Sequence, residues 1–212
     1  LRTVYRLANI QGTWKTLTQL PTAMASGSGA LLNGKLYVAC GWTDEGITNK
    51  MWSLDLNQSD ANWQECQILP GPQRAFPALT ACGNYLYLFG GMGTDSNGSQ
   101  IIMQDAYKYS PEKNQWTRLK DLPWKGYAWS GAALDSDHII LAGKADGQIY
   151  KDIYLIDVME MNTKKIGKTV IQTTTAPLIK VASNEFWLIA GEPDSNKNRT
   201  NIVTSIQFNY TN

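Results

Sequence analysis

The sequence predicts an all-β propeller, in which similar four-stranded sheets are arranged around an axis. Two repeated markers support this prediction. Trp14, Trp63 and Trp116 follow one another at intervals of 49 and 53 residues, with two lysines at 164–165 where a fourth tryptophan would fall. Four apolar segments end at glycines that are 50, 52 and 48 residues apart, and a period of this length is typical of repeat architectures. The segments are residues 35–41, 85–91, 138–143 and 186–191.

The second copy shows the order of the elements within one repeat. An apolar stretch at residues 76–82 precedes the glycine segment at 85–91, and an alternating segment at 105–109 and a tryptophan segment at 115–119 follow. Short apolar segments separated by Gly, Pro, Asn and Asp predict strands joined by turns. One sheet cannot bury both faces, so we expect the sheets to stack with the tryptophans in the seams. The pattern resembles the kelch repeat, which implies a kelch-type β-propeller.

The chain divides into approximate repeats of a single propeller domain, residues 1–212. The repeats are 1–19, 20–68, 69–121, 122–172 and 173–212. The first holds only the last two strands of a sheet, and the last holds only three. A propeller closes to hide its sheet edges, so we expect an N-terminally incomplete part, about four blades, of a six-bladed propeller of about 320–340 residues. The missing N-terminal part, whether cut, disordered or carried on another chain, is then an expected partner.

The composition argues against several functions. The 19 basic and 18 acidic side chains nearly balance, which is unlike a nucleic-acid-binding or membrane-surface protein. No apolar run approaches the ~18 residues of a membrane span. Cys40, Cys66 and Cys82 lie within strand patterns, and we expect them to be small buried apolar residues. A single histidine argues against a copper oxidase of the galactose oxidase type.

The candidate site lies at one mouth of the central channel. Because antiparallel strands alternate in direction, the loops after the second and fourth strands emerge on one face, around the natural concave site of this fold. Glu192 and Arg199 stand out in the loop after the fourth glycine segment. Arg74, Lys125 and Tyr127 come from loops on the same face and are candidate substrate contacts. We expect these side chains to point toward the axis.

Each candidate also has a purely structural interpretation. Arg74 could pack on Trp63 or Trp124 instead of contacting a ligand. Tyr127 could pack between sheets, as aromatic residues often do in such repeats. A glutamate and an arginine in one loop could form an exposed ion pair, which contributes little to stability.

Residues 191–203 carry a narrower resemblance. They read Gly-Glu-Pro-Asp-Ser-Asn-Lys-Asn-Arg-Thr-Asn-Ile-Val and are similar to the signature of the N-acetylneuraminate epimerases, which are kelch-type sialic acid mutarotases. That signature is Gly-Glu, a Lys-Pro-Gly-like stretch, Arg-Thr and an apolar strand. This chain lacks the Pro-Gly and has one extra residue between the glutamate and the arginine. The resemblance implies that Glu192 is the proton acceptor and Arg199 a key active-site residue. The motif lies in the last repeat. This position is similar to that of the motif in the cyclically permuted mutarotase branch of bacteria.

The resemblance implies an isomerase that interconverts the α and β anomers of sialic acid, a small-molecule sugar acid. The implied reaction is acid–base ring opening without a metal or organic cofactor, and the implied location is periplasmic or otherwise extracytoplasmic in a bacterium. Two other functions stay open. One is a kelch module for protein–protein interaction, although such modules usually keep Gly-Gly in every repeat and only residues 90–91 form that pair here. The other is a carbohydrate-binding propeller without catalytic activity.

Overall fold

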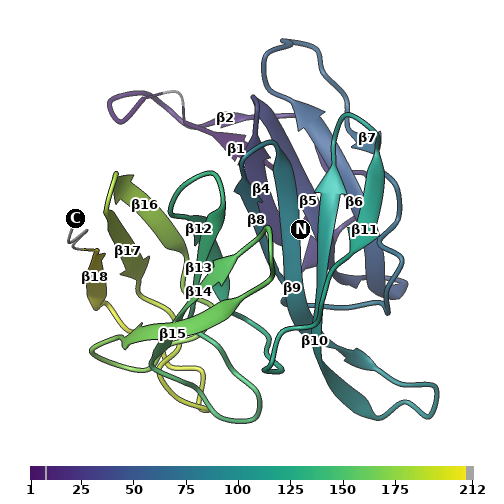
Figure 1. Ribbon diagram of the computed structural model, residues 1–212. Helices are drawn as coiled ribbons and strands as arrows, with labels where there is room; N and C mark the ends of the chain where they lie inside the picture. Colours follow the sequence, from purple (N-terminus) through teal and green to yellow (C-terminus); the bar gives the residue numbers. More distant parts are fainter. Residues whose placement is uncertain (8, 209–212) are drawn as a thin grey trace.

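The computed structural model describes residues 1–7 and 9–208, and in these ranges its regular elements are all β-strands (Figure 1). The described residues contain no helix that could cross a membrane. The strands form a two-stranded N-terminal hairpin and four larger sheets, which we number I to IV in chain order. The hairpin consists of β1 (Tyr5–Arg6) and β2 (Lys15–Thr16). The all-β prediction is confirmed.

Each sheet is built from strands that follow one another along the chain and pair antiparallel. Sheet I consists of β3 (Met24–Ala25), β4 (Ser28–Leu32), β5 (Lys35–Thr43), β6 (Gly46–Asp55) and β7 (Gln64–Glu65). Sheet II consists of β8 (Ala78–Cys82), β9 (Tyr85–Thr94), β10 (Gln100–Ser110) and β11 (Gln115–Arg118). Sheet III consists of β12 (Ser130–Ala133), β13 (His138–Ala142), β14 (Asp152–Asp157) and β15 (Thr163–Lys168). Sheet IV consists of β16 (Leu178–Ala182), β17 (Glu185–Ile189) and β18 (Val203–Gln207).

The strand that leads to the repeated glycine is the second strand of every sheet, as the sequence predicts. In sheet II, β9 lies between β8 and β10, and β13 and β17 have the same place in sheets III and IV. Sheet I differs because its first strand is divided into β3 and β4, which both pair with β5. The division falls at Ser26, whose φ of 57° lies in the left-handed region.

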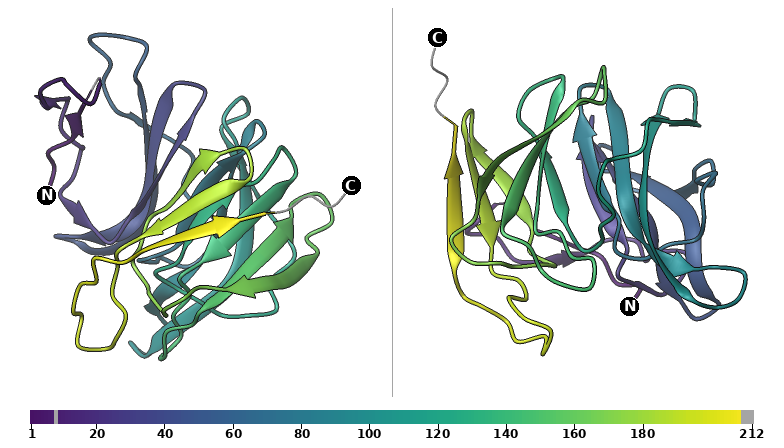
Figure 2. Two further views of the ribbon diagram at one scale, coloured as in Figure 1. Left: turned by 90° about the vertical axis from the view of Figure 1, so that its left-hand side faces the viewer. Right: turned by 60° about the horizontal axis from the view of Figure 1, so that its bottom comes forward.

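The first strands of neighbouring sheets lie side by side, β4 against β8, β8 against β12 and β12 against β16 (Figure 2). Backbone hydrogen bonds connect the residues just before these strands. The N–H of Phe76 donates to the carbonyl of Ser26 at 2.7 Å, that of Ala128 to Phe76 at 2.8 Å, and that of Thr175 to Ala128 at 2.8 Å. All four residues have positive φ, between 53° and 57°. We call Ser26, Phe76, Ala128 and Thr175 the inner ladder.

Glycine is required where the second strand ends beside the inner ladder. Gly191 has a φ of 94°, and a Cβ there would lie 2.6 Å from the carbonyl oxygen of Thr174. Gly41 has a φ of 103°, and its Cβ would meet the carbonyl oxygen of Ala25 at 2.5 Å. A side chain would therefore separate the second strand from the backbone that it must approach.

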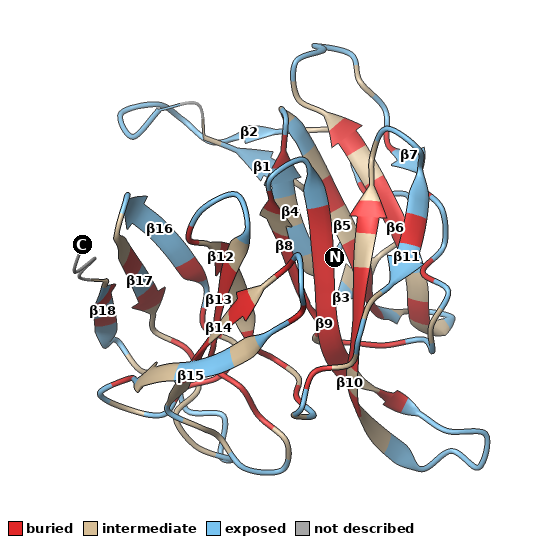
Figure 3. Ribbon diagram, in the orientation of Figure 1, coloured by how far each residue is buried: buried red, intermediate tan, exposed pale blue. Residues whose placement is uncertain are grey.

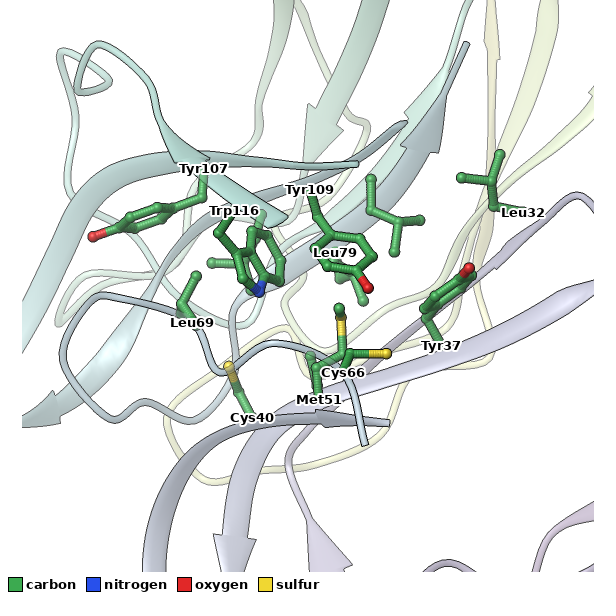
Figure 4. Close-up of a cluster of buried hydrophobic side chains, with 13 residues drawn as sticks. Leu32, Tyr37, Cys40, Met51, Cys66, Leu69, Leu79, Tyr107, Tyr109 and Trp116 are labelled. Atoms are coloured by element: carbon green, nitrogen blue, oxygen red, sulfur yellow. The ribbon is translucent and has the colours of Figure 1, made fainter. Parts of the chain in front are cut away.

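Apolar residues fill the seams between sheets, and β9 is therefore buried along most of its length. In contrast, β16 in sheet IV is mostly exposed (Figure 3). Trp116 lies in the seam between sheets I and II, where it packs at 5.0 Å from the ring of Tyr109 (Figure 4). Trp63 is buried against sheet I and the N-terminal hairpin segment. The expectation for Trp14 is wrong, since this residue of the N-terminal hairpin is 67% exposed.

The cysteines are buried, as expected. Cys40 and Cys66 lie in the seam between sheets I and II (Figure 4), and Cys82 lies between sheets II and III. Burial raises the pKa of the Cys40 thiol to about 12. These residues therefore pack as small apolar side chains.

Candidate active site

A cavity of about 1170 Å³ opens at the inner ends of the four sheets. All four residues of the inner ladder line it. Parts of the segments that join the second and third strands of sheets III and IV, with Met92 of β9 and Gln100 of β10 in sheet II, complete its wall. The two kinds of loop that the sequence places on one face thus meet at one concave site.

Glu192 and Arg199 form an ion pair on this wall. Nη2 of Arg199 lies 3.0 Å from Oε1 of Glu192, and the Glu192 side chain is 16% exposed whereas that of Arg199 is 66% exposed. The backbone of Glu192 exchanges two hydrogen bonds with Thr174, of 2.8 and 2.9 Å. The carboxylate is thereby fixed beside the inner ladder. A positioned carboxylate can accept a proton, and an accessible guanidinium can bind an anion.

Two neighbouring threonines hold this pair in place. The hydroxyl of Thr174 donates to the carbonyl of Ala128 at 2.9 Å, which ties sheet IV to sheet III. The hydroxyl of Thr175 accepts a hydrogen bond from Nη1 of Arg199 at 3.1 Å. Arg199 therefore has one contact to Glu192 and one to the inner ladder, and the guanidinium has five N–H groups in all.

Tyr127 lines the same cavity and packs against a second aromatic residue. Its ring centroid lies 6.3 Å from that of Phe76, and the two planes are inclined by 58°. Both side chains are half-buried. The backbone of Tyr127 pairs with Ala145 through hydrogen bonds of 3.0 and 3.1 Å. The structure thus brings three sequence-predicted site residues, Tyr127, Glu192 and Arg199, to one cavity.

The expectation that Arg74 points to the channel and contacts substrate is wrong. Its side chain is 0% exposed and binds Asp105 of β10 through two hydrogen bonds, of 2.6 and 2.8 Å. Nη1 also donates to the carbonyl of Gly90 at 2.9 Å, and the guanidinium lies 5.5 Å from the centroid of the Tyr107 ring. Buried charge is favourable only when it is paired, so the arginine turns into sheet II rather than toward the solvent.

Lys125 lies away from the Glu192 cavity. Its exposed side chain lines a second, smaller hollow of about 530 Å³ beside sheet III. There Lys144 pairs with Asp146 at 2.6 Å, and the ring of Trp124 packs on Tyr154 at 4.0 Å. The structure therefore does not join Lys125 to the other candidate substrate contacts.

Phe76 and Thr175 are site residues that the sequence analysis missed. Both lie on the inner ladder, at positions that repeat at intervals of about fifty residues like the glycines. A comparison of the residues just before each first strand could have identified them. Their positive φ values, 55° and 53°, could not have been recognised, because bulky and β-branched residues rarely adopt that conformation.

The stacked sheets, the inner ladder and the cavity define a β-propeller with a ligand-sized site at the mouth of its channel. The fold is similar to that of a solved protein described as "Structure of YjhT", with a TM-score of 0.75 and 21% identity over 89% of this chain and 64% of that chain. A model of the N-acetylneuraminate epimerase family matches residues 17–188. The chain therefore belongs to the N-acetylneuraminate epimerase family, and its fold is the kelch-type propeller that the sequence predicts.

Curated relatives agree with this assignment. An N-acetylneuraminate epimerase of Pasteurella multocida is 31% identical over 84% of this chain and 46% of its own length. One of Haemophilus influenzae (strain PittEE) is 30% identical over 66% of this chain and 36% of its own length. A kelch domain-containing protein of Vibrio cholerae is 29% identical over 92% of this chain and 60% of its own length. The chain thus spans about a third to three-fifths of these relatives. The family match ends before Glu192, so it supports the fold and family but assigns no role to that loop.

Proposed function

We propose that this chain carries the active site of a sialic acid mutarotase, which interconverts the α and β anomers of N-acetylneuraminate. The observation that carries the proposal is the Glu192–Arg199 pair on the cavity wall, in a chain of the N-acetylneuraminate epimerase family. Relatives with that name support the substrate class.

In the proposed reaction Glu192 is the general base and Arg199 binds the substrate carboxylate. Glu192 accepts the proton of the anomeric hydroxyl, the bond from the anomeric carbon to the ring oxygen breaks, and the ring oxygen takes up a proton from Glu192 or water. The anomeric carbon is then a ketone. Rotation exposes the other face of the ketone, and the hydroxyl formed from the ring oxygen adds back to that face. The protons then return to their original groups. No electron is gained or lost in this cycle.

The exposure of the two side chains suits these roles. A partly buried carboxylate keeps a defined position, which proton transfer requires. Arg199 is two-thirds exposed, and among the described residues it donates to Glu192 and Thr175. Further N–H groups of the guanidinium are thus available to hold a carboxylate in two-point geometry.

The test is anomer exchange measured by proton NMR after an α-sialoside is cleaved in the presence of the protein. We expect the protein to accelerate equilibration, and Glu192→Gln to reduce the acceleration by about 10²–10⁴-fold while sugar binding changes little. Glu185→Gln is the matched control, because Glu185 lies on β17 and accepts hydrogen bonds from Trp187 of the same strand and Ser205 of β18. Binding without acceleration would indicate a carbohydrate-binding propeller. Absence of binding would indicate a protein-interaction module.

A further inference from the structure

Phe76 is the one large side chain on the inner ladder. The equivalent residues in the other described sheets are Ser26, Ala128 and Thr175, and all share its left-handed backbone. A bulky residue rarely adopts this conformation, and residues held in it cluster at functional sites. The ring of Phe76 lies in the wall of the cavity, where it can contact a ligand.

The ring forms part of an apolar corner. Phe76 packs on Tyr127 at 6.3 Å. Met92 is held beside Phe76, because the N–H of the preceding Ala75 donates to the carbonyl of Met92 at 2.8 Å. Ile149 is bridged through Ala145 to Tyr127. All four corner side chains line the cavity and are half-buried. We call Phe76, Met92, Tyr127 and Ile149 the apolar corner.

The charged pair lies on another part of the same wall. Arg199 contacts Thr175 of the inner ladder, and Ala128 separates Thr175 from Phe76 along the ladder. Strands joined by backbone hydrogen bonds lie about 4.8 Å apart, so two steps place the backbones of Phe76 and Thr175 about 10 Å apart. Ala128 between them has only a methyl side chain, which leaves space for a ligand to lie across it.

We propose that the apolar corner binds the N-acyl methyl group of the sugar acid while Arg199 binds its carboxylate. This inference rests on the proposed function. In N-acetylneuraminate the carboxylate and the acetamido group are attached to opposite carbons of the pyranose ring, so one molecule presents an anionic end and an apolar end. Aromatic and aliphatic side chains gain stability by removing such a methyl group from water. The corner therefore sets which amino-sugar acids the site accepts.

The test compares kcat/KM for anomer exchange of N-acetylneuraminate with that of the deaminated analogue, which has a hydroxyl in place of the acetamido group. Differences of this kind in an apolar pocket amount to about 10–200-fold, and we expect a preference in that range for the wild-type protein. Phe76→Ser places at this position the residue that sheet I has at Ser26. It should reduce the preference to a few-fold by slowing only the N-acetyl substrate. Ser26→Ala is the control on the same ladder and should keep the wild-type preference.

Saturation-transfer NMR on the wild-type protein gives a second readout that does not depend on the folding of a variant. Saturation of aromatic protons should reach the acyl methyl more strongly than any other group of the bound sugar. An undiminished preference in Phe76→Ser, or a methyl group that receives no enhanced saturation, would overturn the apolar-corner inference while leaving the mutarotase proposal intact. A wild-type protein that neither binds the sugar nor accelerates exchange would overturn both.

Discussion

Sheets II and IV each carry an arginine–carboxylate pair near the inner ladder, and the two pairs differ in what surrounds them. Arg74 and Asp105 form two hydrogen bonds in the interior of sheet II. Arg199 and Glu192 form one contact of 3.0 Å at the cavity wall of sheet IV. An arginine and an acidic residue thus form a structural connection in one repeat and an accessible polar site in the other. The charges of the side chains do not separate these roles, whereas their burial does.

The number of contacts on each guanidinium explains the difference. Arg74 also donates to the carbonyls of Gly90 and Pro72, at 2.9 and 3.2 Å, so each of its three guanidinium nitrogens has a partner. Arg199 faces solvent, where an ion pair adds little to stability but leaves the guanidinium available to a ligand. The comparison predicts that replacing the first pair affects folding and replacing the second affects activity.

The largest expected effect on stability is that of Asp105→Ala. The change leaves the Arg74 charge buried without its carboxylate, and removal of one partner from a buried pair costs about 3–5 kcal/mol. Urea unfolding followed by tryptophan fluorescence measures this loss. Glu192→Ala is the matched change in the exposed pair and should alter the unfolding free energy by less than about 1 kcal/mol. Equal losses for the two variants would remove the distinction between the pairs.

Arg199→Ala should produce the next largest effect, and on activity rather than on folding. A hydrogen bond to a charged group is worth about 1.5–3 kcal/mol, and screening by water at this exposed side chain places the loss near the lower value, about ten-fold in kcat/KM. The loss should vanish for a sugar analogue without the carboxylate. A similar loss with and without the carboxylate would show that Arg199 acts on Glu192 rather than on the substrate.

The repeat markers predict the fold because each has a local physical cause. Gly41 and Gly191 are needed where a strand passes close to neighbouring backbone, and Trp63 and Trp116 fill seams. Such requirements recur in every sheet and are therefore visible as a period. Trp14 keeps the period but lies exposed on the N-terminal hairpin, so the period alone does not determine burial.

The site is less predictable because it depends on the directions of individual side chains. Loop order places Arg74 near the mouth, but its partner Asp105 is 31 residues further along the chain, and nothing in the local sequence links them. The sequence predicts Phe76 as the first apolar residue of a strand. In the structure Phe76 has a positive φ and lies before that strand, in the wall of the cavity. Pairings across a sheet and left-handed backbone at bulky residues both arise from tertiary contacts.

The smallest expected effect is that of Thr175→Val, and it tests how the exposed pair is held. Valine keeps the branched shape at this left-handed position but removes the hydroxyl that accepts the hydrogen bond from Arg199. Loss of one such bond is worth about 1 kcal/mol, so we expect KM for the sugar acid to rise about five-fold with kcat nearly unchanged. Thr175→Ser, which retains the hydroxyl, should restore KM.

Thr174→Val is the matched control for this change, because the Thr174 hydroxyl binds the carbonyl of Ala128 in the neighbouring sheet. We expect it to lower the unfolding free energy by about 1 kcal/mol while KM stays close to that of the wild-type protein. The opposite assignment, with Thr175→Val affecting unfolding and leaving KM unchanged, would make the Arg199 contact a structural connection like that of Arg74. The two adjacent threonines therefore repeat, on the scale of single hydroxyl groups, the contrast between the buried and the exposed ion pair.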